Sequence, residues 1–127
     1  MQGITVTVTT SPEAAEKATR EALADEGFGI LTEIDVAATL ADKLGVQRPA
    51  LKILGACNPQ LAHTAIERDP TVSLLLPCNV VVEQTDEGVT VTAADPRQLL
   101  DDPFLADLAE DAATRLRRAL DVVAAGS

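Results

Sequence analysis

The chain has 127 residues, 46% of them apolar, which is enough for one hydrophobic core without metals or disulfides. Its formal net charge of -10 repels phosphate backbones and anionic lipid heads, and without Trp or Tyr few side chains can stack on bases. We therefore expect one acidic domain over residues 1–127, with neither nucleic acid nor a membrane as a partner.

The N-terminal part of the chain predicts two strands joined by a helix. Apolar residues alternate with threonine over residues 4–9, as in a strand with one face exposed to water. Ser11 and Pro12 are typical of a helix start, because Ser caps the helix and Pro fits its first position. Gly27 is expected to end this helix as a left-handed cap. A second strand is expected over residues 28–36.

The middle of the chain predicts two more helices around a third strand. A short helix is expected over about residues 37–44. The strand expected over residues 49–56 contains a nearly continuous apolar run, as in a strand covered on both faces. Asn58 and Pro59 repeat the cap-and-proline helix start, and this helix is expected to end before Pro70.

The C-terminal part predicts a hairpin followed by a long helix. Leucines 74–76 form a run that we expect to be buried, although the pattern does not identify its structure. Strands over residues 79–84 and 89–92 flank a turn at 86–88 and form a hairpin. Two further helix starts follow, and the second opens a long amphipathic helix; they are Asp95-Pro96 and Asp102-Pro103.

The resulting element order, β-α-β-α-β-α-β-β-α, predicts an α+β fold. The hairpin requires an antiparallel strand pair, whereas the strand-helix-strand units permit parallel pairs. We expect a two-layer domain in which a mixed five-stranded sheet carries helices mainly on one face. Because no segment resembles a signal peptide or a membrane span, a cytoplasmic location with reduced thiols is expected.

The least generic part of the sequence surrounds its two cysteines. Cys57 and Asn58 stand at a helix start, and Cys78 and Asn79 stand at the start of the hairpin. First-turn N–H groups and the helix dipole stabilise anions, so they could lower the pKa of the Cys57 thiol or hold a small anionic ligand. Gly55 would let another group approach the backbone closely. The structural alternative is that both cysteines are buried apolar fillers.

Whether the two thiols lie close together depends on the structure that residues 71–76 adopt. An extended return through the leucines would bring Cys78 beside Cys57, whereas a return that begins at Asn79 would place the cysteines at opposite ends of the sheet. We expect them to be neighbours.

The remaining candidates have plainer explanations. His63, the only histidine, is expected to be exposed, although it could be a base for Cys57 or a third metal ligand beside both thiolates. Six helical steps from Cys57 do not place the two residues on one face. Glu33 and Asp35 share a strand face, which permits acid–base work but more often marks a solvated surface.

Several segments resemble one family, the prokaryotic "domain of unknown function 302". The cysteine segments are the most specific of them; the matching stretches are 26–29, 33–35, 43–45, 53–59, 61–62 and 74–82. The resemblance implies a small α+β domain that is often a homodimer, and it assigns no reaction.

These observations lead to two functional hypotheses. The first is a homodimeric module, without a cofactor, that binds a small molecule, an anion or a partner protein. The alternative is a thiol site at Cys57 and Cys78 that acts in redox chemistry or binds a soft metal. The sequence leaves open whether the chain is an enzyme.

Overall fold

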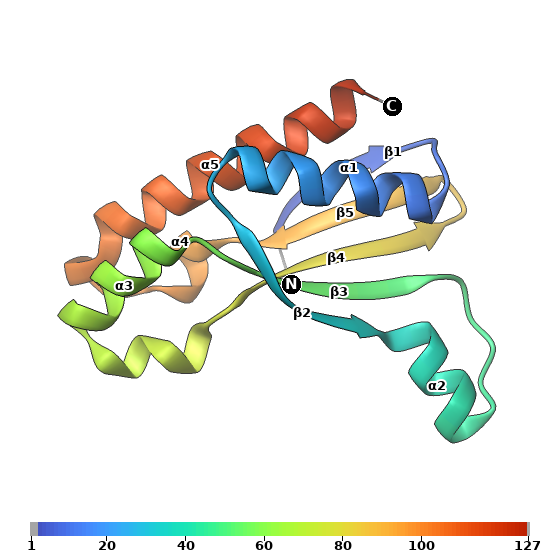
Figure 1. Ribbon diagram of the computed structural model, residues 1–127, viewed down its shortest axis with the longest axis horizontal. Coiled ribbons are helices and arrows are strands. Elements are labelled where there is room, and N and C mark those ends of the chain that lie inside the picture. Colours follow the sequence, from blue (N-terminus) through green and yellow to red (C-terminus); the bar gives the residue numbers. More distant parts are fainter. Residues whose placement is uncertain (1–2, 127) are drawn as a thin grey trace.

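The computed structural model describes residues 3–126 and contains one five-stranded sheet (Figure 1). All four neighbouring strand pairs are antiparallel, and the spatial order is β1-β5-β4-β3-β2. The strands are β1 (Gly3–Val8), β2 (Gly29–Asp35), β3 (Leu51–Cys57), β4 (Cys78–Thr85) and β5 (Gly88–Ala94).

Helices occupy every connection except the β4–β5 hairpin, so the predicted α+β fold and its element order are confirmed. The α-helices are α1 (Pro12–Asp25), α2 (Val36–Leu44), α3 (Pro59–Arg68), α4 (Pro96–Leu99) and α5 (Ala106–Ala125). Two short 3-10 helices, η1 (Pro70–Leu75) and η2 (Pro103–Leu105), were not predicted.

Local chemistry explains where the predicted helices begin and end. The Ser11 Oγ atom accepts a hydrogen bond from the Ala14 N–H at 3.1 Å, which satisfies one free donor of the first turn. Gly27 follows α1 at a φ of 87°, as expected for a left-handed cap. The Phe28 N–H then donates to the Leu23 carbonyl at 2.9 Å and closes the helix end.

The direction of the strands differs from the expected mixed sheet. The strands β1 and β2, which α1 joins, do run in the same direction, but they lie at opposite edges of the sheet. The other connections return the chain to the sheet at the end it has just left, so each next strand runs antiparallel to the previous one. The sequence pattern allowed parallel neighbours but carried no information on strand order.

The main core lies between the sheet and the two long helices, α1 and α5, which cover one face (Figure 1). Leu23 of α1 and Leu116 and Leu120 of α5 pack in the same cluster as Leu54 and Val80 of the sheet. All five are fully buried. The helical side chains come from the apolar stripes of α1 and α5, and the strand residues occupy alternating positions.

The opposite side of the sheet, here called the open face, has no such cover. Its residues are exposed or half-buried, except the buried Gly55. The third strand is therefore not covered on both faces as expected, since Leu51 and Ile53 are only half-buried. By strand register, the open face comprises odd-numbered residues 3–7, 51–55 and 79–83, and even-numbered residues 32–34 and 90–94.

The leucine run at 74–76 is not the buried segment that the sequence predicted. Leu74 and Leu75 belong to η1, and Leu74 is 87% exposed. Val72 is the buried residue of this short helix, and it packs with Ala65 and Leu105 in a second, smaller cluster. Within residues 3–126, no helix combines the length and the apolar character that crossing a membrane requires.

Candidate functional site

The two cysteines lie at the same end of neighbouring strands. Cys57 is the last residue of β3 and Cys78 is the first residue of β4, where it pairs with Ala56. The expectation that they are neighbours is confirmed, but by a different route. The segment between them, α3 and η1, forms an excursion beyond the end of the sheet, and no extended leucine strand returns along it (Figure 1).

A small apolar cavity lies beneath this excursion. Its volume is about 40 Å³, and both cysteines and Asn58 border it. The remaining wall is aliphatic and comes from β3, α3, η1, α4 and α5; it includes Leu61, Ala62, Ala65, Leu76, Leu108 and Ala112. The cavity therefore lies where the two hydrophobic clusters meet, and with Cys78 of β4 six separate elements border it.

Burial acts on both thiols in the same direction, and it raises their pKa. Desolvation raises the pKa of the Cys57 thiol above its ordinary value. Desolvation also raises the pKa of Cys78, and the nearby Cys57 adds a smaller effect of the same sign. The helix start had left open a lowered pKa at Cys57, beside the alternative that both cysteines are apolar fillers. Burial is the first cause at both sulfurs and favours the neutral thiol over the thiolate.

The strand register is unfavourable for a disulfide between the two cysteines. The residue opposite Cys78 is Ala56, so Cys57 is displaced by one position along β3. Successive side chains of a strand point to opposite faces, and a disulfide needs side chains that point toward each other. Both cysteines are free in the structure.

Asn58 uses its side chain to join two helices. Its Oδ1 atom accepts a hydrogen bond from the Leu61 N–H at 3.2 Å and caps α3, as the sequence predicted. Its Nδ2 atom donates to the Glu26 carbonyl oxygen at 3.5 Å, where α1 ends. Arg115 of α5 donates to the same carbonyl at 3.3 Å. The start of α3 is therefore already capped by protein groups.

Gly55 and Asn79 lie on the open face, away from the helix-covered side. A Cβ atom at Gly55 would collide with Thr32 Oγ1 and would lie 2.8 Å from Pro77 Cγ. The close approach that Gly55 allows is therefore by protein side chains. Asn79 is exposed and borders a separate hollow of about 410 Å³, with Val81 among its neighbours. The structure does not bring Asn79 to the cysteine cavity.

His63 is also separate from the cysteines. It is exposed on α3 and does not border the cavity, in agreement with the prediction of a surface histidine. Within residues 3–126, no three or more His, Cys, Asp or Glu side chains are grouped so that they could hold a metal ion. A metal at this site would have to rely on Cys57 and Cys78 alone.

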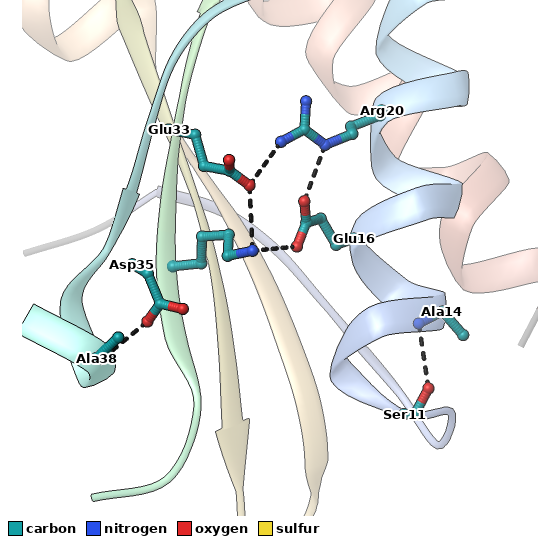
Figure 2. A network of polar contacts seen from close by, with 8 residues as sticks. Ser11, Ala14, Glu16, Arg20, Glu33, Asp35 and Ala38 are labelled. Atoms are coloured by element: carbon teal, nitrogen blue, oxygen red, sulfur yellow. Dashed lines mark hydrogen bonds and ion pairs between the residues drawn. The ribbon is translucent and has the colours of Figure 1, made fainter.

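Sequence reasoning missed a network of four charged side chains between α1 and the sheet (Figure 2). Arg20 Nε and Nη2 each lie 2.9 Å from a carboxylate oxygen, of Glu16 and Glu33 respectively. Lys52 Nζ lies 2.9 Å from Glu16 and 3.1 Å from Glu33. Only the Glu16–Arg20 spacing of four residues was visible in the sequence, because the other partners meet through the strand register.

The electrostatics of this network are those of a structural clamp. Burial raises the pKa of Glu16, but hydrogen bonds from Lys52 and Arg20 outweigh it and hold the pKa below its usual value. Hydrogen bonds to Glu16 and Glu33 raise the pKa of Lys52. Asp35 caps α2 by accepting from the Ala38 N–H at 2.9 Å, so Glu33 and Asp35 have separate partners (Figure 2). No acid–base pair of carboxylates forms there.

Comparison with known proteins identifies relatives of the same kind. A family model described as "Domain of unknown function DUF302" matches residues 4–123. The chain is also similar to a solved structure, "uncharacterized conserved protein DUF302 from Bacillus stearothermophilus". That similarity has a TM-score of 0.85 and 32% sequence identity, and it covers 93% of this chain and 94% of that one. No curated protein matches the chain.

Proposed function

The chain belongs to the family described as domain of unknown function DUF302, and on that premise we propose that it is a binding module for a small apolar molecule. The ligand's apolar end would occupy the cavity beside Cys57 and Cys78, and its polar end would remain at the surface. One observation carries this proposal: the cavity wall is almost entirely aliphatic, apart from Asn58 and two thiols whose pKa is raised by burial.

The chemistry of the cavity favours an apolar ligand over an anion. An anion at the start of α3 would need free N–H groups, but Pro59 has none and Asn58 already binds the Leu61 N–H. The raised pKa of both thiols has burial as its first cause, so the same surroundings would penalise a bound anion. An alkyl group carries no such cost.

The size of the cavity limits what it can hold. A volume of about 40 Å³ is smaller than the roughly 150 Å³ of cavities that bind benzene. It suits a short alkyl group or a methyl-bearing end of a larger molecule. We therefore expect weak binding by a simple probe and tighter binding by the physiological ligand, whose polar part would add contacts at the mouth.

The test uses short straight-chain alcohols as neutral probes. Titration of labelled protein with ethanol, butanol and hexanol, followed by two-dimensional NMR, should shift backbone signals of the cavity wall. Leu61, Ala65 and Leu76 are the residues expected to respond most. Butanol should shift them at lower concentration than ethanol, because each buried CH₂ contributes about 0.8 kcal/mol.

A matched pair of variants separates the cavity from the rest of the surface. Ala62→Leu adds volume at a half-buried wall position of α3 and should abolish the shifts. Ala124→Leu makes the same change at a half-buried position of α5 outside the cavity and should leave them unchanged. Shifts that persist in Ala62→Leu, or that spread over the whole molecule, would contradict the proposal.

Two further proposals concern the oligomeric state and the cellular location of this module. We propose that the chain acts as a homodimer and resides in the cytoplasm. The supporting observations are an open sheet face without a covering layer and two cysteines that are both free. Sedimentation of the purified protein tests the first, and localisation of a tagged protein in its host tests the second.

A thiol function remains a second proposal, because the two cysteines border the same cavity. In the redox version, one of the two thiols would attack an external disulfide, form a mixed disulfide with one half of it and release the other half as a thiol. In the metal version, both thiolates would bind one soft ion such as Cu(I). Native mass spectrometry with and without reductant would detect the added mass of the mixed disulfide or of the metal. Unmodified thiols after exposure to oxidised glutathione and to Cu(I) would contradict both versions.

A further inference from the structure

The open face is nearly free of charge, in contrast to the rest of this acidic chain. Charged residues make up 24% of the sequence, and the formal net charge is -10. On the open face, Glu83 is the only position with an ionisable side chain. Its Oε2 atom lies 2.7 Å from Arg48 Nη2, so even this charge has an opposite partner. The open face therefore has no cluster of like charges that would repel a second acidic molecule.

The centre of the open face is apolar. Ile34, Ile53 and Val81 are cross-strand neighbours on β2, β3 and β4, and Thr92 and Thr5 continue the same row to the opposite edge. Ile34 is 50% exposed, and Ile53 and Val81 are half-buried. Aliphatic side chains are typical of strand faces that pack against another layer, and threonine is a favoured residue in strands.

From these observations we propose that two copies of this chain associate through their open faces, with sheet packed on sheet. This inference rests on the proposed homodimer and names its surface. Packed sheets align at about 30° and lie about 10 Å apart, with the side chains of both inner faces interdigitated. The two-fold axis would pass near Val81, so that the apolar row of one copy crosses that of the other.

Charge identifies a second copy as the occupant. Each copy carries a net charge of -10, so two copies meet at least cost where both surfaces lack carboxylates. A basic partner protein would instead seek an acidic surface, and the open face is not one. The same patch on both molecules also satisfies the requirement of a two-fold interface, because apolar and threonine side chains are complementary to themselves.

The size of the face is adequate for a stable contact. The five strands have six to eight residues each. The face therefore measures roughly 20 Å along the strands and 24 Å across them, about 500 Å² as a flat area. Side-chain relief raises the accessible surface above this projection, toward the ~800 Å² per partner of specific interfaces. Packing would bury the half-exposed Ile34, Ile53 and Val81, which have no other cover in one copy.

The experiment compares the mass of the wild type with that of three glutamate variants by sedimentation equilibrium. The wild type should have twice the monomer mass of 13.3 kDa. Val81→Glu and Ile34→Glu each place two like charges in the interface, and we expect the dissociation constant to rise more than ~100-fold. Val122→Glu changes a 61%-exposed valine on α5, in the other layer, and should remain dimeric.

The outcomes distinguish this inference from the proposals on which it rests. Far-UV circular dichroism and thermal unfolding show whether each variant is folded. Should Val81→Glu fail to fold, Ile34→Glu still tests the surface, because Ile34 lies at an exposed position on an edge strand. A monomeric wild type would overturn both the homodimer and its surface. A dimer that persists in both variants would overturn the surface alone. Alcohol titration of the Ile34→Glu monomer tests the cavity independently of either.

Discussion

At the scale of single residues, the two cysteines show that position in a motif does not determine thiol chemistry. Cys57 precedes a helix start, which would stabilise a thiolate if the site were polar and open. Its actual neighbours are aliphatic, and burial raises the pKa of Cys57 and of Cys78. The balance between dipole and desolvation depends on what packs around the sulfur.

Slow alkylation of both thiols is the prediction at this scale. The variants Cys78→Ser and Cys57→Ser each leave one thiol, and both should react with iodoacetamide more slowly at neutral pH than an unstructured cysteine peptide. Each rate should rise with pH, with a midpoint above the peptide's value of about 8.5. Cys78 should be the slower, since it is more deeply enclosed by protein than Cys57 and burial is the main cause of its raised pKa.

Iodoacetamide is neutral, so the negative charge of the protein does not repel it. The same variants in denaturant should react at the peptide's rate, which controls for intrinsic differences. A thiol that reacts faster than the peptide in the folded protein would contradict the raised pKa and would favour the thiol function.

At the scale of elements, the cavity depends on how α3 is held at the end of the sheet. Asn58 caps α3 and also contacts the Glu26 carbonyl at the end of α1. The Arg118 guanidinium, 2.9 Å from the Glu26 carboxylate, joins α5 to the same point. Three helices are thus joined through Glu26 and Asn58, and Asn58 is one residue from Cys57. This junction fixes the position of the cavity wall.

Removal of the cap should loosen this junction. We expect Asn58→Ala to lower the free energy of unfolding by about 1 kcal/mol, the usual contribution of a helix cap. Urea unfolding monitored by circular dichroism measures it. Asn58→Asp keeps the capping oxygen but loses the amide donor to Glu26, so its loss should be smaller. Equal stability of Asn58→Ala and the wild type would show that the cap contributes nothing.

At the scale of the whole molecule, stability should be distributed unevenly between the layers. The side of the sheet under α1 and α5 holds the large buried residues, whereas none of the nine residues of α2 is buried. Leu44, at the end of α2, is 70% exposed. Helices with little apolar burial open locally without unfolding the rest of the domain.

Hydrogen exchange should reveal this difference directly. Amides of α2 should exchange through local opening, at a free energy well below that of global unfolding. Amides of α5 around Leu116 and Leu120 should exchange only near the global value, because both side chains are fully buried. Mass spectrometry of exchanged peptides resolves the two helices. Equal protection of α2 and α5 would show that another surface covers α2.

Many local features followed from the sequence alone. The helix starts at Ser11-Pro12 and Asn58-Pro59, the end at Gly27 and the hairpin turn depend on a few adjacent residues, so the chain specifies them without its fold. The α+β class followed from the alternation of strand and helix patterns. The exposure of His63 followed in the same way from its place off the apolar stripe.

Only the tertiary structure decided how these elements meet. The antiparallel strand order, the exposed Leu74 and the clamp around Lys52 all depend on contacts between residues far apart in the chain. The same is true of the cavity, whose wall joins α3 to α5, and of the raised pKa of the thiols that border it. Adjacent residues determine caps and turns, whereas burial and charge pairing are set by whatever the fold brings alongside.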